Sequence, residues 1–283
     1  MPEIRSFGVL FSTQDAASLN ILARLKEMKE CIETDEDRFG HRVFHVKGID
    51  NARFYTTDTR PVYCENYDEQ MPEDMIIFAT KHMSASGIKS LSVHSPGNWG
   101  KGDLGGRDKT LCIAPARHLR MALFKLKELA KELPVEIIQE CTHHGPEIKK
   151  PVMFIEIGSS EEDWGDEQCG KAIAETIIYI ISNPVPECKA AFGIGGLHHT
   201  PVFTELMHRS DFCFGHVCPK YNLENLDEGM VRQVIDKTSE KVDMIFLDWK
   251  GLKDQKDRII QMLDSMGLEY MKTKEIHKTT ETK

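Results

Sequence analysis

Short apolar runs rich in β-branched and aromatic residues alternate along this chain with amphipathic segments of helical period. Residues 6–11 (SFGVLF) and 75–80 (MIIFAT) are typical of buried strands. Residues 15–30 and 116–133 carry apolar side chains at helical spacing, and the second segment stops at Pro134. Repeated alternation of strands and helices predicts an α/β fold with a largely parallel or mixed sheet and helices on both faces.

The same pattern continues towards the end of the chain. Further strands are expected at residues 91–94, 135–142, 152–158, 190–195 and 244–249, and further helices at residues 159–181 and 254–267. A single α/β catalytic domain is predicted over residues 1–275, with a polar excursion from the sheet near residues 34–74. Residues 276–283 are expected to form a frayed tail.

Charge and composition limit the classes of partner. The 283 residues carry a formal net charge of −9, from 36 basic and 45 acidic residues. This balance argues against broad binding to nucleic acid and against a DNA partner, but it allows a local basic patch for an RNA end.

The apolar runs fall short of the roughly 20 residues that a membrane span needs, and no secretion signal is recognised at the amino terminus. The eight cysteines include no CxxC pair. A cytoplasmic protein with reduced thiols and no membrane partner is expected.

Histidines follow the expected strands at five places, which are His82, His94, the pair His143–His144, the pair His198–His199, and His216. In open α/β sheets ligands bind outside the carboxyl ends of strands, so residues far apart in sequence can converge there. One histidine at a strand end is more often a hydrogen-bonded edge residue, but five such positions favour one site. Adjacent side chains on an extended strand point to opposite faces, so each pair is expected to send one imidazole inward unless a glycine turns the chain.

Glycines and serines accompany these histidines. The GIGG segment at residues 193–196 lacks the GxGxxG spacing, which argues against a nucleotide cofactor. The amides of Gly195 and Gly196 could instead approach a phosphate, a ribose or an oxyanion, and a tight turn explains these glycines equally well. Ser84 and Ser86 follow His82 closely; hydrogen bonding to a substrate or to the turn is favoured over nucleophilic attack, because the GxSxG elbow is absent.

Charged residues near the expected strand ends offer further contacts. Residues 96–109, which include Gly97, Asn98 and Lys101, could contact a phosphate, although a solvated loop is the favoured alternative. Glu156 lies inside an apolar run, where a buried carboxylate needs a partner such as a histidine or a metal ion. Lys250 offers a cation directly after the last expected strand.

Five segments together carry a resemblance to a known family. They are KHMSASGIKSLSVHSPGN, ECTHHGP, FIEIGSSEEDW, FGIGGLHHTPVFT and LDWKGL, in this order between about residues 75 and 252. The chain resembles the archaeal and plant type of D-aminoacyl-tRNA deacylase. The resemblance implies hydrolysis of the ester between a D-amino acid and the 3′ end of tRNA. It also implies an α/β core similar to peptidyl-tRNA hydrolase and the phosphorylase/hydrolase-like fold, with zinc as the associated metal.

One segment departs from the family pattern. His199, Thr200 and Val202 stand where a tyrosine, an alanine and an arginine are usual, so the basis for an anion contact at Val202 is lost. His198 and Thr204 in the same segment are retained. The rest of the match is unaffected by these departures.

The resemblance and the residues together suggest roles. Water is expected to be positioned by His143 or His144 with His198, either directly or through zinc. The amides of Gly195 and Gly196 are expected to stabilise the oxyanion, and Thr204 is placed among the catalytic residues. The expected substrate-binding residues are His82, Ser84, Ser86, His94, Gly97, Asn98, Lys101, His199 and Lys250. The expected zinc ligands are His144, His198, Glu156 and His216.

Two other functions stay open. A peptidyl-tRNA or N-acyl amide hydrolase would use the same site to cleave an amide. A non-catalytic tRNA-end-binding protein would use the glycines and the basic loop for phosphate alone, which leaves the histidines unexplained. The expected partner in the preferred case is the 3′ acceptor end of D-aminoacyl-tRNA, and a monomer is the expected state.

Overall fold

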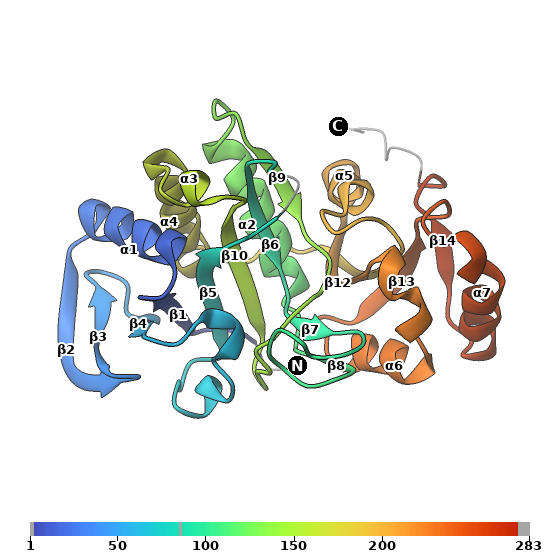
Figure 1. Cartoon of the computed structure of the whole chain (residues 1–283), viewed down its shortest axis with the longest axis horizontal. Helices are drawn as coiled ribbons and strands as arrows, with labels where there is room; N and C mark the ends of the chain where they lie inside the picture. The colour runs from blue at the N-terminus through green and yellow to red at the C-terminus, as the bar shows by residue number, and fades with distance from the viewer. Residues whose placement is uncertain (1–2, 85–86, 277–283) are drawn as a thin grey trace.

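The computed structural model describes residues 3–84 and 87–276, and its largest element is an eight-stranded sheet (Figure 1). Its strands are β1 (Phe7–Ser12), β2 (Cys31–Arg38), β3 (His41–Val46), β4 (Ala52–Thr57), β5 (Met75–Lys81), β6 (Ser90–His94), β9 (Glu136–Gln139) and β10 (Val152–Gly158). They lie in the order β2-β3-β4-β1-β5-β10-β6-β9. The central strands β4, β1, β5 and β10 are parallel, whereas β6 runs antiparallel to β10 and parallel to β9.

A second sheet of four strands follows in the order β12-β11-β13-β14, and all its pairs are parallel. These strands are β11 (Lys189–Ile194), β12 (Phe212–Cys218), β13 (Val242–Leu247) and β14 (Tyr270–Lys272). A short ribbon joins β7 (Gly97–Asn98) to β8 (Thr110–Leu111). The predicted α/β class with largely parallel or mixed pairing is confirmed.

Helices cover the sheets unevenly. The α-helices of the described residues are α1 (Ala16–Met28), α2 (Ala116–Leu129), α3 (Glu161–Trp164), α4 (Glu167–Ser182), α5 (Pro201–Arg209), α6 (Glu228–Asp236) and α7 (Lys256–Ser265). The 3-10 turns are η1 (Pro61–Tyr63), η2 (Tyr67–Glu69), η3 (Lys220–Asn225) and η4 (Lys253–Gln255). No described helix has the length and apolarity that a membrane crossing needs.

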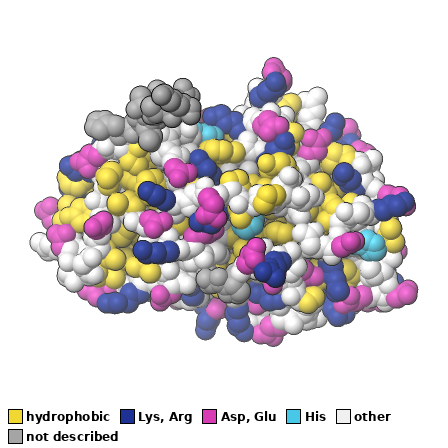
Figure 2. Space-filling view, turned by 180° about the vertical axis from the view of Figure 1, so that it is seen from behind, with side chains coloured by type: hydrophobic (Ala, Val, Ile, Leu, Met, Phe, Trp, Pro, Cys, Tyr) yellow, Lys and Arg dark blue, Asp and Glu magenta, His cyan; other side chains and the backbone are white. Residues whose placement is uncertain are grey.

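The core explains why one face of the large sheet is available for a site. Helices α1, α2 and α4 pack on one face in a cluster that continues to α5 and the small sheet. The opposite face of the large sheet is covered mainly by the η1–η2 region and by residues near 112 and 148. The small sheet carries helices on both faces, because α6 and α7 pack opposite α5. On the molecular face seen in Figure 2, basic and acidic side chains are interspersed.

Three sequence predictions differ in detail from the fold. Only part of residues 34–74 leaves the sheet, since β3 and β4 pair into it and the chain departs after β4. The helix expected at 159–181 is interrupted, and α4 begins anew after Asp166. The Asp166 side chain accepts hydrogen bonds from the amides of Gln168 and Cys169, which makes it a separate helix cap. The strand expected at 135–142 ends at Gln139 as β9.

Candidate functional site

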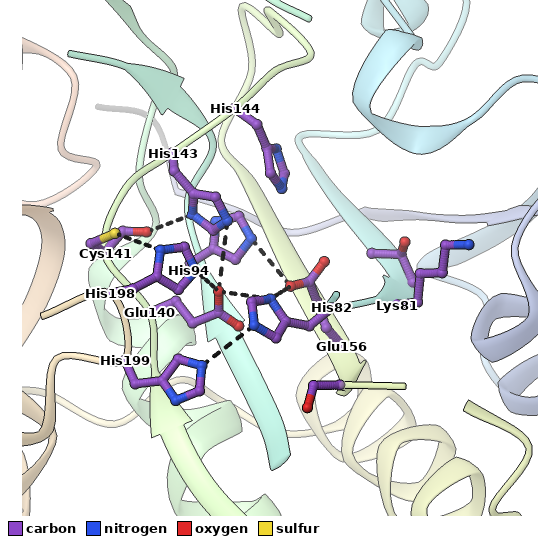
Figure 3. Close-up of polar contacts among 12 residues, drawn as sticks. Lys81, His82, His94, Glu140, Cys141, His143, His144, Glu156, His198 and His199 are labelled. Carbon is purple, nitrogen blue, oxygen red and sulfur yellow. Dashed lines mark hydrogen bonds and ion pairs between the residues drawn. The ribbon is translucent and has the colours of Figure 1, made fainter. Parts of the chain in front are cut away.

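The site lies over the face of the large sheet that the helices do not cover, where loops from both sheets meet (Figure 3). Glu156 projects from β10 and His94 from the end of β6, while His82 follows β5. His198 and His199 follow β11 of the small sheet. The sequence predicted that the five histidine positions share one edge of the sheet. They do not, because β6 runs antiparallel to β10. Loops, rather than a common edge, bring them together.

The segment 140–144 connects the two sheets and fixes the first histidine pair. The amide of Cys141 donates to the carbonyl of His198 at 2.8 Å, and the amide of Gly97 donates to the carbonyl of His144 at 2.7 Å. Gly97 has a φ of +149°, and a Cβ there would lie 2.8 Å from the backbone of β8. A glycine is therefore required at this contact, which supports the histidine pair.

Glu140 is the centre of the cluster and is 1% exposed. Its Oε2 accepts hydrogen bonds from His198 Nε2 at 2.8 Å and from His82 Nδ1 at 3.1 Å. His143 Nε2 lies 3.6 Å from the same oxygen. Burying an unpaired carboxylate costs several kcal/mol. Contacts with the Glu140 carboxylate therefore fix the positions of these imidazoles.

Glu156 and His94 form a deeper layer that is almost free of solvent, at 2% and 0% exposed. Glu156 Oε2 lies 3.5 Å from His94 Nε2 and 3.7 Å from His82 Nδ1. Within the described residues, Glu156 Oε2, His94 Nε2 and Glu140 Oε1 have no hydrogen-bond partner. Buried polar atoms without a partner are rare, and three in one cluster fit the donor set of a metal ion.

Three groups of donor atoms in the described residues are compact enough to hold a metal ion. Within each group the donor atoms lie within 4.8 Å of one another, and the groups are His82, Glu140, His143 and His198; His94, His143 and His144; and His94, Glu140 and Glu156. Imidazole nitrogens and carboxylate oxygens are ordinary ligands of zinc and of other divalent transition metals. The cluster therefore fits a metal by donor type and by spacing.

Hydrogen bonds raise the pKa of two of the histidines, from Cys141 and Glu140 at His198 and from Glu140 at His82. Burial lowers the pKa of His198, but hydrogen bonds with Cys141 and Glu140 outweigh it and raise the pKa to about 10. At His82 burial is likewise outweighed by the hydrogen bond with Glu140, and the pKa is raised. Burial opposes ionisation of Glu140, yet the hydrogen bonds from His198 and His82 lower its pKa well below its ordinary value. In the metal-free protein these groups form a charged unit.

The deeper groups have the opposite character. Burial lowers the pKa of His94 to about 4 and the pKa of His144 to about 3. Burial and the neighbouring His94 lower the pKa of His143 well below its ordinary value. Burial and the charge of Glu140 raise the pKa of Glu156 well above its ordinary value. Neutral imidazole is the form that binds metals, so His94, His143 and His144 are already in the ligating state at neutral pH.

Both histidine pairs direct both rings towards the cluster, which corrects the prediction of one inward ring per pair. The rings of His143 and His144 lie 4.3 Å apart, and those of His143 and His198 lie 4.4 Å apart. His199 Nε2 lies 3.4 Å from His82 Nε2. The pairs are not in extended strands, since His144 has a left-handed φ of +42° and the second pair stands in a turn.

A network beside His198 was not recognised in the sequence. His198 Nδ1 lies 3.0 Å from the hydroxyl of Tyr221, and Cys141 Sγ lies 3.3 Å from that hydroxyl and 3.6 Å from His198 Nδ1. Glu140 was missed as well, although a carboxylate at the end of an apolar run and three residues before a histidine was a usable signal. Tyr221 lies in η3, and nothing in its local sequence pattern marks it.

The Gly195 amide does not serve as predicted. Gly195 donates its N–H to the carbonyl of Cys218 at 2.8 Å, within the extension of the small sheet. Gly195 and Gly196 have φ values of +98° and +87°, and a Cβ on Gly251 would lie 2.6 Å from the nitrogen of Gly196. The left-handed turn and the close packing explain these glycines, and the Gly195 amide is not available to an oxyanion.

Two further predicted residues lie apart from the cluster. His216 is inside β12, where its Nδ1 is 3.1 Å from Thr142 Oγ1 and its Nε2 is 3.1 Å from the carbonyl of Lys237. Both ring nitrogens are engaged, so His216 is a structural residue and not a metal ligand of this cluster. Thr204 accepts a hydrogen bond from the amide of Gln139 at 3.1 Å and so joins α5 to β9.

The remaining predicted substrate residues are spread around the site. The side chain of Asn98 donates to two carbonyls of its own loop, at 2.8 and 3.3 Å, which gives it a loop-supporting contact. Lys101 and Lys250 are exposed, and neither belongs to the donor groups of the cluster. The amide of Ser84 donates to a main-chain carbonyl, and Ser86 lies outside the described residues.

Replacing Glu140 by glutamine should lower the stability of the metal-free protein in a pH-dependent way. The raised pKa of His198 means that its stabilising contact is fully present below the unfolded pKa of about 6.5 and is lost as pH rises towards about 10. Urea unfolding at pH 6 should therefore show a loss of about 3 kcal/mol, with a smaller loss at pH 9.5. Glu30→Gln, at an exposed pair with Lys47, should cost less than about 1 kcal/mol. Equal losses for Glu140→Gln at both pH values would contradict the charged unit.

Known proteins match this chain over most of its length. The family model described as D-aminoacyl-tRNA deacylase matches residues 69–271. A D-aminoacyl-tRNA deacylase of Thermococcus onnurineus is 36% identical in an alignment of 274 residues that covers 93% of this chain and 98% of the relative. One from Pyrococcus furiosus is 35% identical over 93% of this chain and 99% of the relative. One from Methanosarcina mazei is 34% identical over 95% of this chain and 92% of the relative.

A solved structure agrees with this match. The crystal structure of a conserved protein of unknown function superposes with a TM-score of 0.88 at 29% identity, over 97% of this chain and 98% of that chain. The sequence and the fold therefore match over nearly the whole length, and the histidine-rich segments lie inside the matched region. This chain belongs to the D-aminoacyl-tRNA deacylase family.

Proposed function

We propose that this protein hydrolyses the ester that joins a D-amino acid to the 3′ end of tRNA, and so returns mischarged tRNA to translation. The observation that carries the proposal is the buried cluster around Glu140, in a chain that belongs to the deacylase family. An ester is already activated, so its hydrolysis needs a placed water molecule and a donor for the oxyanion. The cluster offers groups for both tasks.

Zinc is the metal that we propose for the cluster. The neutral imidazoles of His94, His143 and His144 would hold it, with Glu156 beside them. A bound zinc ion lowers the pKa of a water ligand to about 7 and so supplies a nucleophile at neutral pH. Two of the unpartnered atoms, His94 Nε2 and Glu156 Oε2, support this proposal, because each would gain a partner from a bound cation.

Glu140, His198 and Tyr221 supply the oxyanion donor in this proposal. Cys141 and Glu140 together raise the pKa of His198 to about 10, so His198 is a proton donor and not a base at neutral pH. Its Nδ1 then donates to the Tyr221 hydroxyl, 3.0 Å away, and polarises it. Burial and the neighbouring Cys141 raise the pKa of Tyr221, so the phenol keeps its proton. In this proposal the Tyr221 O–H donates to the developing charge on the ester oxygen, a role that the engaged amide of Gly195 cannot fill.

The surrounding expectations follow from the substrate. The 3′ end of D-aminoacyl-tRNA is the proposed partner, and the cytoplasm and a monomeric state are the proposed setting. Cleavage of N-acyl amides would indicate an amide hydrolase instead. Binding to a tRNA end without turnover would indicate a non-catalytic binding protein.

The direct test is a comparison of D-tyrosyl-tRNA with L-tyrosyl-tRNA. The D-ester should be lost faster, because a pocket that accepted both forms would drain the abundant L-aminoacyl-tRNA. Exhaustive removal of metal, verified by metal analysis, should abolish turnover, and added zinc should restore it. Turnover that survives metal removal would exclude an obligatory metal. Faster cleavage of an N-acetyl-D-tyrosyl amide than of the ester would exclude the deacylase.

Tyr221→Phe tests the oxyanion donor. Loss of one such donor costs about 10² to 10³ in rate, so kcat on D-tyrosyl-tRNA should fall by that factor with little change in KM. Tyr270→Phe is the matched control, since it also removes a phenolic hydroxyl, here one bonded to Asp264 on the surface. Its kcat should equal that of the unmodified protein. An unchanged kcat in Tyr221→Phe, with metal content preserved, would show that Tyr221 takes no part in the reaction.

A further inference from the structure

A cavity of about 130 Å³ opens beside the histidine cluster. Its inner wall includes His82, His144 and Glu156, which are cluster residues. Its other walls come from the start of α1, the end of β5, the η1 turn and Leu104. The cavity therefore links the cluster to the surface at a place where residues from several strands and loops meet.

Two basic residues line this cavity, Arg60 before η1 and Lys81 at the end of β5. Arg60 is exposed and Lys81 is half-buried, whereas the inner residues His82 and Glu156 are 5% and 2% exposed. In Figure 3 the side chain of Lys81 extends away from the histidines. The cavity thus has a cationic outer part and a histidine-lined inner part.

Arg60 differs from every other arginine of this chain. Within residues 3–84 and 87–276, each other guanidinium donates a hydrogen bond or forms an ion pair. Arg60 does neither in that part of the chain, and its guanidinium rests 5.5 Å from the centre of the Tyr63 ring. The Lys81 ammonium also has no ion pair among those residues and lies 4.3 Å from the centre of the Trp164 ring. The chain has a net charge of −9, yet these two cations at one cavity have no ion pair. They are therefore able to bind an anionic ligand.

The cavity also contains carboxylates, and they do not compete for these cations. Asp15 accepts hydrogen bonds from the amides of Ser18 and Lys81 and from the hydroxyl of Thr80, at 2.7 to 3.2 Å. It therefore serves as the cap of α1. Glu156 faces His82 and His94 on the other side. The guanidinium of Arg60 and the ammonium of Lys81 remain available to a ligand.

We propose that Arg60 and Lys81 form a subsite for the last phosphodiester groups of the tRNA 3′ end. The inference rests on the proposed function and names the substrate contact that guides the ester to the cluster. The amino acid of an aminoacyl-tRNA has no free carboxylate, because that group forms the ester. Apart from acidic side chains, the anions near the terminus are phosphodiesters, and the planar guanidinium fork matches phosphate oxygens.

Kinetics on two esters test this subsite. Arg60→Met and Lys81→Met should each raise KM for D-tyrosyl-tRNA about tenfold with kcat unchanged, as expected for the loss of one charged hydrogen bond. Each should also reduce the slope of log KM against log salt by about 0.7, the value for one phosphate contact on a single strand. D-tyrosyl-adenosine has no phosphate, so its hydrolysis should not change. Arg60→Lys should keep the salt slope and recover part of the affinity.

Matched controls distinguish the loss of a subsite contact from the general effect of removing one positive charge. Arg232→Met and Lys241→Met remove exposed cations of the same type elsewhere, and they should leave both substrates unaffected. An equal loss on D-tyrosyl-adenosine would overturn the assignment, since the contact would then be to the acyl or adenosine group. An unchanged KM and salt slope on D-tyrosyl-tRNA would overturn it as well.

A binding measurement keeps this inference separate from the proposed hydrolysis. An ACCA oligonucleotide with a neutral methylphosphonate at its last linkage should bind the unmodified protein about tenfold more weakly than the natural oligonucleotide. The Arg60→Met, Lys81→Met double variant should bind both oligonucleotides equally. Equal binding of both by the unmodified protein would refute the subsite whether or not the protein hydrolyses esters. Preserved discrimination without any ester hydrolysis would refute the proposed function alone.

Discussion

The buried negative charge of Glu140 is the constraint on which this site depends. The carboxylate is almost fully removed from solvent, and its Oε2 is bonded to His198 from one sheet and to His82 from the other. Neither histidine is near Glu140 in the sequence, so the pairing forms only when the two sheets are in place. The charge therefore links the assembly of the fold to the arrangement of the site, because a misplaced imidazole would leave a buried carboxylate unpaired.

That one charge divides the histidines into two chemical kinds. The pKa of His198 is raised to about 10 and that of His82 is also raised, whereas burial lowers the pKa values of His94, His143 and His144. The first kind can donate a proton or polarise a neighbour such as Tyr221, and the second kind can bind a metal. Ester hydrolysis needs an electrophilic contact and an activated water at the same time, and the division supplies candidates for both within one cluster. Environment, rather than residue type, assigns the roles.

Much of this arrangement could be predicted from the sequence, and the reasons for the failures are physical. The strand and helix periods gave the α/β class, and the two histidine pairs marked the region of the site, because these signals are local. The convergence of Glu140 and Tyr221 on His198 is not local and needs the packing of both sheets. The prediction of Gly195 as an oxyanion donor was wrong, since positive φ and close packing produce the same sequence pattern as a ligand loop. His216 followed an apolar run but lies inside the strand, where its ring completes internal hydrogen bonds.

Nitrogen-15 NMR of the histidine side chains in the metal-free protein at pH 7 tests the central claim most directly. Chemical shifts and proton couplings distinguish imidazolium from neutral imidazole, and single histidine substitutions assign the signals. The predicted spectrum has His198 as a cation and His94, His143 and His144 as neutral rings, and the pKa of His198 should be lower in Glu140→Gln. A neutral His198 in the unmodified protein would contradict the account, because Glu140 would then not control the site.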